Sequence, residues 1–561
     1  MKYFKFARVA LVSMAVFSQA SHGALYQVTE IDTHAVSKNA FPVDMNESGD
    51  IVMSLTYSSQ FPLAEYNIPI DLSLIDFESE TLQDNLTDIE AAQNGNFNLE
   101  DYQTILSVIR AGQGVRTVQR LVPWLSYVSD TGAVSYIPGF DVEDADYSGY
   151  TKSVDTRVKG INDSGVIVGN SEGNPVKVEY VNEDDEEITY LVRGHTTRGF
   201  VDLNGNTVGL VSDSDLVGGY TEARDVNNSL MVAGLEIFNP REAITEAVET
   251  CNDEEDRGDQ PLETCLQNLH ATLFSTHHRR AVIWQLDTDG NVTDTMTYEV
   301  PFEPEEDDDR LFSSEALAIN ENGVAVGRTT NFFEDNTDFM SQYAAVFSGD
   351  EIISITDRNE YRSSIATDIN DSNLVTGYAV KRINGIDRSK FFVYNTDSNE
   401  ISFPDDFFPG SSSVARGINN NGQVVGEGEV ETTLSSTRRR EAFVYDVNDS
   451  TFQNLNDLLS CDSPYTIIQA HSINDSGQIA ALARVRRAET DVQGNLALAD
   501  DGSENLVDTF ITVRLNPIPG GEIDSCDDDD DDTSAPDRQG GSTGWGLLLL
   551  PLVLLMRRFK R

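Results

Sequence analysis

The strongest constraint on the fold is a short turn pattern that recurs seven times along the chain. Each copy has an apolar residue, an asparagine, two polar residues, usually a glycine, and then an alternating apolar run. Glycine or asparagine at the fifth place suits a positive φ, and the first asparagine can bond to the turn backbone. The pattern therefore predicts a β-hairpin at each copy. The repeat-turn asparagines are Asn46, Asn162, Asn227, Asn320, Asn370, Asn419 and Asn474.

A second pattern, rich in aromatic and β-branched residues, follows most of these hairpins. It reads Arg280-Ala281-Val282-Ile283-Trp284 in one copy and Glu441-Ala442-Phe443-Val444-Tyr445 in another. The hairpin and this second pattern together give three or four strands per unit. Successive asparagines from Asn320 to Asn474 are 50, 49 and 55 residues apart. This spacing is the length of a four-stranded propeller blade with generous loops.

Longer intervals separate the first four asparagines, at 116, 65 and 93 residues, and these intervals indicate insertions into the repeat. Two insertions are predicted to be helical, at about residues 64–120 and 236–275. In the first, we expect helices over Ser79–Ala91 and Leu99–Ala111, with Asn98 capping the second helix. The rest of the repeat region is predicted to be β-structure.

Seven small sheets can hide their apolar faces by packing against one another around a common axis. The first strand, near Tyr26–Ile31, can close such a ring against the last strand, near Phe510–Leu515. The sequence therefore predicts an all-β fold over residues 24–520, a seven-bladed β-propeller with two small helical insertions. A β-solenoid or a pair of sandwiches is the alternative arrangement.

The first 23 residues have the layout of a secretory signal peptide. Lys2, Lys5 and Arg8 precede an apolar run, and small residues follow it before Ala24. The apolar run is shorter than the ~20 residues that a spanning helix needs, which favours cleavage over a retained N-terminal anchor. We therefore expect the export machinery to carry this chain out of the cytoplasm.

The other end of the chain has three parts, a Gly540-Gly541 pair, a short apolar stretch and the basic residues Arg557–Arg561. The positive-inside rule keeps those cations cytoplasmic, so the bulk of an exported chain would lie outside an inner-membrane intermediate. Residues 540–561 resemble the GlyGly-CTERM sorting signal of Gram-negative bacteria. The resemblance implies transient membrane insertion, cleavage by a rhomboid-type intramembrane protease (the rhombosortase) and delivery to the cell surface (outer membrane) or the medium. A permanent C-terminal anchor is the alternative.

The chain is strongly acidic, with 39 Lys and Arg against 94 Asp and Glu and a formal charge of -55. Both end segments carry cations and no acids, so their removal would make the charge more negative still. Such a charge repels phosphate backbones, which argues against nucleic acid as a partner. Residues 521–539 contain the acidic run Asp527–Asp532 and are predicted to be a flexible linker. Calcium is the cofactor that this run suggests, although a string of like charges lacks the geometry of a tight site.

Four cysteines fit an exported protein, because disulfides persist in oxidising compartments. Four thiols allow three pairings, and their positions favour Cys251 with Cys265 and Cys461 with Cys526. The first pair would join two helices of the second insertion. A zinc site is disfavoured because the sequence has no Cys-x-x-Cys pair.

The repeats resemble the HAF repeat of exported bacterial proteins, which is named for a His-Ala-Phe tripeptide. Glu441-Ala442-Phe443 and Arg280-Ala281-Val282 stand in that place here, and no copy has the histidine. With the C-terminal signal, the whole chain resembles a gammaproteobacterial family of exported proteins that carries a domain of unknown function. The resemblance covers about residues 24–515 and implies a fold and an exported location, without catalytic residues.

The sequence predicts neither catalytic nor metal-binding residues. Gly169-Asn170-Ser171-Glu172-Gly173 matches Gly-x-Ser-x-Gly, but a strand pattern follows it where a nucleophile elbow needs a helix. His277 and His278 are expected in a solvated loop. The turns at Asp287–Asn291 and Asp202–Asn206 carry oxygen ligands near glycine, but neither continues to the bidentate glutamate that a calcium loop requires.

Cations gather between the hairpin and the aromatic strand of several units, although the chain as a whole is acidic. In a propeller these equivalent loops emerge on one face, which predicts an anion-binding face with bidentate guanidinium contacts. Its main residues are Arg198, Arg280, Arg388, Arg439, Arg440 and Arg486. Ordinary pairing with neighbouring acids is the alternative.

Together these features favour an exported, cell-surface or secreted, non-catalytic β-propeller that binds an anionic glycan or a protein partner. The alternative is an extracellular hydrolase or lyase that acts at the central funnel. An enzyme would gather acids, histidines or a metal that break the repeat at one end of the channel. A binding protein would show a broad surface built from loops, with aromatic residues and cations.

Overall fold

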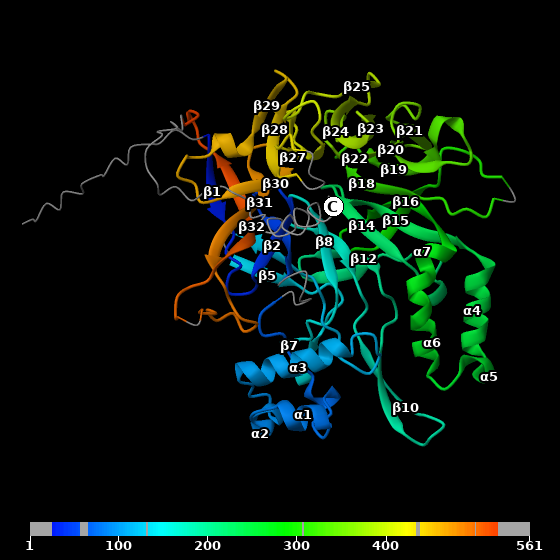
Figure 1. The fold of residues 1–561 in the computed structure, drawn as a ribbon. Coiled ribbons are helices and arrows are strands. Elements are labelled where there is room, and N and C mark those ends of the chain that lie inside the picture. Colours follow the sequence, from blue (N-terminus) through cyan, green and yellow to red (C-terminus); the bar gives the residue numbers. More distant parts are fainter. Residues whose placement is uncertain are drawn as a thin grey trace, which may run out of the picture. The chain divides into compact units, whose positions relative to one another are not determined.

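Seven four-stranded antiparallel sheets follow one another along the chain in this computed structural model (Figure 1). The structure describes residues 25–56, 65–130, 133–147, 149–305, 308–433, 438–499 and 501–524. Internal contacts divide the chain after Asp524, so all the described residues belong to one compact unit. Each sheet is one blade, and the predicted seven-bladed β-propeller is confirmed.

In blades 1 to 6 the four strands pair in chain order, and the first strand is the innermost. Blades 1 to 3 contain β2 (Asn39–Met45), β3 (Ile51–Thr56), β4 (Leu125–Asp130) and β5 (Ala133–Ile137); β8 (Thr156–Ile161), β9 (Ile167–Ser171), β12 (Arg198–Leu203) and β13 (Asn206–Gly209); and β14 (Thr221–Val226), β15 (Met231–Pro240), β16 (His277–Leu286) and β17 (Val292–Tyr298). Blades 4 to 6 contain β18 (Ser314–Ile319), β19 (Ala325–Phe332), β20 (Met340–Ser348) and β21 (Glu351–Ser354); β22 (Ser363–Ile369), β23 (Leu374–Ile383), β24 (Ile386–Asn395) and β25 (Glu400–Ser402); and β26 (Ser413–Ile418), β27 (Gln423–Glu429), β28 (Arg440–Asp446) and β29 (Thr451–Asn454).

Blade 7 closes the ring with a strand from the other end of the chain. It contains β30 (Thr466–Ile473), β31 (Ile479–Ala488), β32 (Leu506–Pro517) and, as its outermost strand, β1 (Tyr26–Glu30). β1 lies antiparallel to β32, with Val28 opposite Leu515. The carboxylate of Glu30 also forms an ion pair with Arg487. The predicted closure of the first strand against the last is therefore present.

Short helices and one extra hairpin interrupt the first three blades. They are α1 (Glu80–Asn85), α2 (Ile89–Gln93) and α3 (Leu99–Ala111) in blade 1, the hairpin β10 (Val176–Val181) and β11 (Glu187–Val192) in blade 2, and α4 (Glu242–Asn252), α5 (Glu254–Arg257), α6 (Leu262–Leu269) and α7 (Leu273–Thr276) in blade 3. A small two-stranded sheet, β6 (Glu143–Asp144) with β7 (Gly149–Tyr150), joins blades 1 and 2. Short 3-10 turns are η1 (Leu72–Leu74), η2 (Ala145–Tyr147), η3 (Leu216–Gly218), η4 (His270–Thr272), η5 (Phe333–Asp335) and η6 (Leu455–Leu458).

The first insertion differs from its prediction at one point. Helix α3 has the expected bounds, and Asn98 caps it by accepting the N–H of Asp101 at 2.8 Å. The helix expected over 79–91 is broken into α1 and α2, because the Asp101 carboxylate accepts the N–H groups of Thr87 and Asp88 at 2.6 and 3.1 Å. Those bonds hold the backbone between the two helices outside the helical ladder.

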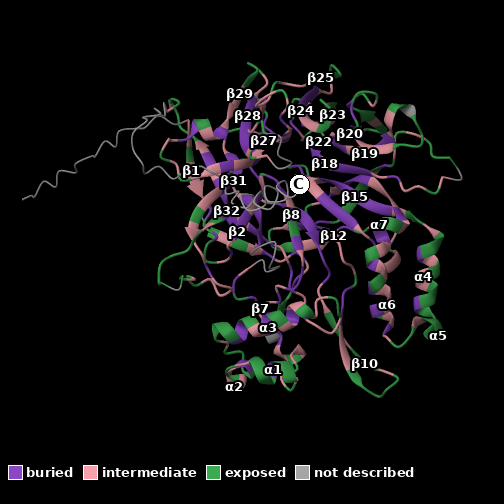
Figure 2. Ribbon diagram, viewed as in Figure 1, coloured by how far each residue is buried: buried purple, intermediate pink, exposed green. Residues whose placement is uncertain are grey.

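The blades pack on one another through apolar side chains that are buried in the strands (Figure 2). Alanine and glycine let the two innermost strands of a blade approach closely. A Cβ atom at Gly234 would lie 1.9 Å from the carbonyl oxygen of Glu222, and one at Gly327 would lie 2.0 Å from that of Glu315. The glycine that ends most copies of the turn pattern therefore makes room for the neighbouring backbone.

Both end signals lie beyond the part of the chain that the structure describes. Residues 1–23, the linker run Asp527–Asp532 and the Gly540-Gly541 pair all fall outside it. Among the described residues, no helix has the length and apolar character to cross a membrane.

Candidate functional site

The seven repeat-turn asparagines form a closed circle at one end of the central channel. Each side-chain Nδ2 donates to the backbone carbonyl of the asparagine in the next blade at 2.9–3.3 Å, and Asn474 of blade 7 donates to Asn46 of blade 1. Each Oδ1 accepts the N–H four residues later in its own turn at 2.9–3.0 Å. All seven side chains are at most 5% exposed. The asparagine therefore shapes its own turn and fastens its blade to the next.

A second circle runs through the residues that follow these asparagines. Each backbone N–H donates to a side-chain oxygen of its counterpart in the next blade at 2.8–3.0 Å. These residues are Glu47, Asp163, Asn228, Glu321, Asp371, Asn420 and Asp475. With the asparagines and the apolar residues before them, they line a cavity of about 390 Å³. We call this end of the channel the Asn mouth.

The Asn mouth is acidic, and its carboxylates accept hydrogen bonds from the backbone of neighbouring turns. Burial, together with the negative charges of Asp475 and Asp163, raises the pKa of Glu47. One oxygen of Glu47 accepts the N–H of Asp475 at 2.8 Å. The circle of acceptors is therefore a structural feature of the ring.

A β-bulge interrupts the innermost strand of every blade three residues before its asparagine. The bulged residue is left out of the ladder on the strand edge nearest the channel. These residues are Val43, Lys159, Arg224, Leu317, Thr367, Arg416 and His471. The residue type at the bulge therefore differs from blade to blade, whereas the Asn mouth has the same asparagine in all seven blades.

Three aspartates lie directly after bulges, in blades 1, 3 and 5. Asp44, Asp225 and Asp368 each accept the backbone N–H of an isoleucine in the following blade at 2.8–3.1 Å. Burial raises the pKa of all three carboxyl groups. The pKa of Asp225 rises to about 7, with the charge of Asp44 adding to the effect of burial. These side chains fasten neighbouring blades and keep their protons at a higher pH than ordinary aspartates.

One wall of the channel, farther from the Asn mouth, carries a cluster of charges from blades 2 to 4. Its members, which we call the blade 2–4 wall, are Arg157, Lys159, Arg224, Arg279, Arg328, Asp155, Glu222 and Glu315. Arg224 forms ion pairs with Glu222 and with one oxygen of Glu315, and Arg328 contacts the other oxygen of Glu315 at 2.6 Å. Although burial opposes it, Arg224 and Arg328 hold the pKa of Glu315 below its ordinary value.

The long insertions all occur at the end of the channel opposite the Asn mouth. They interrupt the connection between the second and third strands of blades 1, 2 and 3, and in blade 7 the same connection spans residues 489–505. In Figure 1 the helices α1–α6 and the hairpin β10–β11 project to one side. We call this end the insertion face.

Most of the exposed large apolar side chains among the described residues belong to connections or strand ends at the insertion face. They are Val115, Val142, Val176, Val181, Val211, Phe274, Phe339, Ile386, Leu496, Leu498 and Leu506. Phe339 and Leu498 are among the most open, at 63% and 58% exposed. The insertion face is therefore a broad surface built from loops, with exposed apolar side chains.

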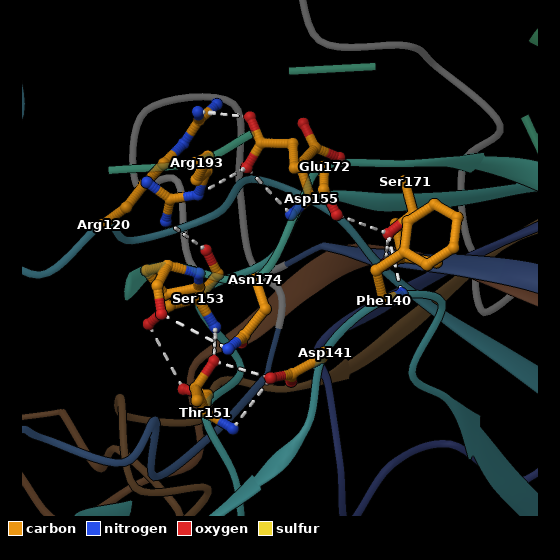
Figure 3. A network of polar contacts seen from close by, with 12 residues as sticks. Arg120, Phe140, Asp141, Thr151, Ser153, Asp155, Ser171, Glu172, Asn174 and Arg193 are labelled. Carbon is orange, nitrogen blue, oxygen red and sulfur yellow. Dashed lines mark hydrogen bonds and ion pairs between the residues drawn. The ribbon is translucent and has the colours of Figure 1, made fainter. Parts of the chain in front are cut away.

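A buried polar network ties the insertions to blade 2 (Figure 3). Glu172, 5% exposed, forms ion pairs with Arg120, which follows α3, and with Arg193, which follows β11. Arg193 also donates its backbone N–H to the Gln267 side chain on α6 at 3.1 Å. Groups from all three insertions therefore meet at one place on the insertion face.

The serine of the Gly-x-Ser-x-Gly match belongs to this packing. Ser171 ends strand β9 and is 1% exposed. Its Oγ lies 2.9 Å from Thr156 Oγ1 and accepts the N–H of Phe140 at 3.2 Å (Figure 3). Strand β10 follows at Val176, so the helix of a nucleophile elbow is absent from this described segment. The match is a feature of the blade.

The solvated loop predicted at His277 and His278 is wrong. Both residues open strand β16, where they pair with β15 across the helical insertion. His277 is fully buried, and the ring of His278 packs against Phe238 and Phe312. Burial lowers the pKa of both imidazoles. The error arises because β15 and β16 are separated in sequence by the helical insertion, so their pairing is not evident from the residues next to His277.

Most of the six arginines of the predicted anion-binding face have partners of their own. The ion pairs are Arg280 with Glu236 at 2.8 Å, Arg388 with Glu429 at 3.1 Å, Arg439 with Glu441 at 3.3 Å and Arg440 with Glu427 at 3.7 Å. Arg198 and Arg486 donate to the carbonyl oxygens of Gly218 and Leu506. Neighbouring acids therefore balance the charge of four of these side chains.

The disulfide between Cys251 and Cys265 joins α4 to α6, in agreement with the predicted pairing. Cys461 is disulfide-bonded as well. Its predicted partner, Cys526, lies outside the described residues.

The two aspartate turns with calcium-like composition are hairpin turns. Asp287 accepts the N–H of Asn291 at 2.8 Å, and Asp202 accepts that of Gly205 at 2.6 Å. In the described ranges, no three or more His, Cys, Asp or Glu side chains are placed to hold a metal ion.

The sequence prediction missed the residues of the channel. The available signal was the position three before each asparagine, where Val43 and Leu317 alternate with Lys159, Arg224 and Arg416. Cations at a position that other copies fill with apolar residues mark a departure from the repeat. Because the sequence does not reveal the bulge, this position is indistinguishable there from an ordinary strand residue.

Two solved structures, a protease domain and a peptidase, are similar to this chain. The β-propeller domain of the Trilobed protease from Pyrococcus furiosus is 10% identical, with a TM-score of 0.37, over 84% of this chain and 96% of that chain. The acylaminoacyl peptidase of Pyrococcus horikoshii is 10% identical, with a TM-score of 0.34, over 85% of this chain and 53% of that chain. Likeness at this level carries no argument about function.

Comparison with curated proteins gives no match. A family match, by contrast, spans residues 3–558, which is nearly the whole chain. The family is described as "Protein of unknown function (DUF3466)". The chain therefore belongs to the DUF3466 family.

Proposed function

We propose that this chain is an exported, non-catalytic β-propeller that binds an extracellular anionic glycan or protein partner through its insertion face. The main support for this proposal is that long connections and exposed apolar side chains are concentrated at the insertion face. Large exposed apolar areas on a soluble protein mark interaction sites, and binding residues are often carried by loops on a firm scaffold. The other end of the channel is occupied by the hydrogen-bonded circles of the Asn mouth.

The chemistry of the channel supports binding over catalysis. A general base works best with a pKa near the operating pH. Burial, with the charge of Arg416, lowers the pKa of His471 to about 3, so its ring is a weak base. The pKa of Asp225 is about 7, but its carboxyl group, like those of Asp44 and Asp368, is engaged as the acceptor of a backbone N–H in the following blade. The channel side chains thus hold the ring together, which disfavours a hydrolase or lyase at the funnel.

Export is supported by the Cys251–Cys265 disulfide, because such bonds persist mainly in oxidising compartments. The proposed route uses the signal peptide at 1–23, an inner-membrane intermediate held by 540–561, and cleavage by a rhomboid-type intramembrane protease. Replacing Gly540 and Gly541 with alanine tests this route by cell fractionation. We expect the variant to accumulate in the membrane fraction at full length, and unchanged release to the surface or medium would contradict the route.

Binding is tested with the secreted protein and two substitutions on the insertion face, Phe339→Asp and Leu498→Asp. The matched control is Val292→Asp, which changes a 43%-exposed side chain at the start of β17, near the Asn mouth. We expect the first two variants to weaken binding to immobilised acidic polysaccharides at least tenfold and the control to leave it unchanged. Equal effects of all three variants, or equal binding to neutral polysaccharides, would contradict a binding role for this face.

The anion-binding arginines and the calcium interaction remain predictions. Arg198 and Arg486, whose partners are backbone carbonyls, are the members of the predicted set with charge left for a ligand. Thermal unfolding of the full chain with calcium and with a chelator tests the cofactor. An unchanged melting temperature in the presence of calcium would contradict calcium binding.

A further inference from the structure

The blade 2–4 wall holds more positive than negative charge, in a chain whose formal charge is -55. Its cations are Arg157, Lys159, Arg224, Arg279 and Arg328, and its acids are Asp155, Glu222 and Glu315. The acids have cationic partners already. Asp155 pairs with Arg157 at 2.9 Å, and Glu222 and Glu315 pair with Arg224 and Arg328. The wall therefore has two cations in excess.

Lys159 is one of these two cations. It is the bulged residue of β8, and no described residue forms a hydrogen bond or an ion pair with its ammonium group. Burial, with repulsion from Arg224, lowers its pKa to about 8. A partly buried ammonium group without a direct ion pair is costly, because it has lost water and the charges of Glu222 and Glu315 act on it only from a distance.

Arg279 is the other cation in excess. Its backbone forms a bridge to Ser313, close to Glu315, at the start of β16. Its guanidinium lies over the ring of Phe274 at 4.5 Å, and its buried Nε has no hydrogen-bond partner. The buried Nε of Arg224 likewise has no partner. Both Nε–H donors therefore lack an acceptor among the described residues, which is uncommon for buried polar groups.

The charge of the whole chain limits what that acceptor is. Surface acids repel a polyanion, although salt screens exposed charges beyond ~8 Å at physiological ionic strength. Partly buried cations inside the channel are screened less. A compact group with one negative charge therefore gains the contacts of the wall at the least electrostatic cost, and an acidic polysaccharide with widely spaced carboxylates is repelled less by the surface acids than a densely charged one.

We infer that the blade 2–4 wall is a binding subsite for a single carboxylate group, carried by an otherwise neutral sugar chain, with Lys159 and Arg279 as the two cations that supply its uncompensated positive charge. The inference rests on the proposed function, because it names the group that a bound glycan would place in the channel. Ammonium and guanidinium groups together form charge-assisted hydrogen bonds to a carboxylate, and these are stronger than neutral ones.

The test is isothermal titration calorimetry of the full secreted protein with glucuronate, with glucose as the neutral match and with inorganic phosphate at equal ionic strength. We expect glucuronate to bind more tightly than either of the other probes. Lys159→Gln and Arg279→Gln should each weaken glucuronate binding at least tenfold. Without ligand, Lys159→Gln should melt no lower than the unmodified protein, because it removes an unbalanced charge.

The matched control is Arg382→Gln, which removes one positive charge from an exposed position near the end of β23 in blade 5. It should leave glucuronate binding within twofold of the unmodified protein. Glucuronate binding no tighter than that of glucose, tighter binding of phosphate, or an equal loss in Arg382→Gln would overturn the subsite.

The two sets of experiments distinguish a failure of the carboxylate subsite from a failure of the proposed function. If Phe339→Asp and Leu498→Asp abolish polysaccharide binding while glucuronate does not bind, the subsite is wrong and the insertion face stands. If glucuronate binds as expected while both insertion-face variants keep full polysaccharide binding, the subsite stands and the role of the face is wrong.

Discussion

At the scale of single residues, the repeat-turn asparagine forms hydrogen bonds both within its own turn and to the next blade, in all seven blades. One side chain accepts an N–H within its own turn and donates to the carbonyl of the next blade. Serine, aspartate or glycine can serve a tight turn, but only an amide side chain of this length offers both a donor and an acceptor here. This dual use explains why the residue type recurs even where the glycine of the turn is replaced, as at Leu230 and Asn373.

Asn227→Asp tests the donor half of this contact. Aspartate keeps the acceptor for the Met231 N–H but places a carboxylate oxygen against the Asn320 carbonyl. We expect a loss of roughly 1–3 kcal/mol in unfolding free energy, the usual cost of leaving a buried group without its partner. Urea unfolding measures it, with Asn96→Asp, at an exposed position before α3, as the control. No loss in Asn227→Asp would show that the contact between blades does not stabilise the ring.

Gly165→Ala tests the positive φ of the turn. Gly165 has a φ of +78° with open space around it, so a methyl group meets no neighbour and only the backbone conformation resists the change. We expect a loss of about 1–2 kcal/mol in unfolding free energy. Gly194→Ala is the control, because Gly194 also has open space but no positive φ. Equal effects of the two substitutions would contradict the explanation.

Asp225 gives the ring a pH dependence with a defined sign. The folded chain keeps its proton up to about pH 7, whereas an unfolded aspartate releases it near about pH 4. Stability from this group is therefore present below pH 4 and falls as the pH rises to 7. We expect Asp225→Asn to lose less unfolding free energy between pH 5 and 8 than the unmodified protein, in denaturant titrations. Asp508→Asn, at an exposed site, should keep the original slope, and a steeper slope in Asp225→Asn would contradict the account.

At the scale of elements, the sequence predicts strands and turns better than it predicts insertions. The hairpins follow from a pattern that is local, because turn residues and alternating apolar residues occupy neighbouring positions. The hairpin β10–β11 lies in the 65-residue interval that indicated an insertion, whereas His277 was placed in a loop and opens a strand. This error concerns β15 and β16, which pair across the helical insertion, so that no local pattern gives their pairing.

The channel residues were missed for a related reason. A bulge shifts the register by one residue without changing the composition of the strand, so Lys159 and Arg224 read as ordinary strand positions. The partners of arginines such as Arg280 also depend on which acid the register places opposite, here Glu236. Such pairings follow from the register of the sheet, which the sequence pattern of one strand does not specify.

The disulfide of the helical insertion gives a prediction at this scale. Cys251 and Cys265 are 14 residues apart and join α4 to α6. Opening a loop of this size costs about 3 kcal/mol. We expect Cys251→Ser to make α4–α6 sensitive to limited proteolysis while the blades keep their resistance, and mass spectrometry of the fragments identifies the cleavage sites. Cleavage within β15 or β16 at the same rate would show that the insertion and blade 3 unfold together.

At the scale of the whole molecule, the chain forms a ring with two different ends. The Asn mouth repeats the same contacts in every blade, so its residues were visible in the sequence as a repeat. The insertion face departs from that repeat in blades 1, 2, 3 and 7, and the proposed binding surface lies there. The proposed carboxylate subsite lies on the channel wall, where cations replace the apolar residues of other blades. Symmetry thus accounts for stability, and departures from symmetry account for the proposed function.

The most direct test of the closed ring is amide hydrogen exchange, measured by mass spectrometry on peptides that contain the seven turns. The critical amides are those of Asp50 and Gln478, in the turns of blades 1 and 7, where the two ends of the chain meet. A closed ring predicts that these two turns exchange as slowly as the Leu374 turn in blade 5. Fast exchange at Asp50 and Gln478, with protection kept at Leu374, would mean that the ring is open between its first and last blades.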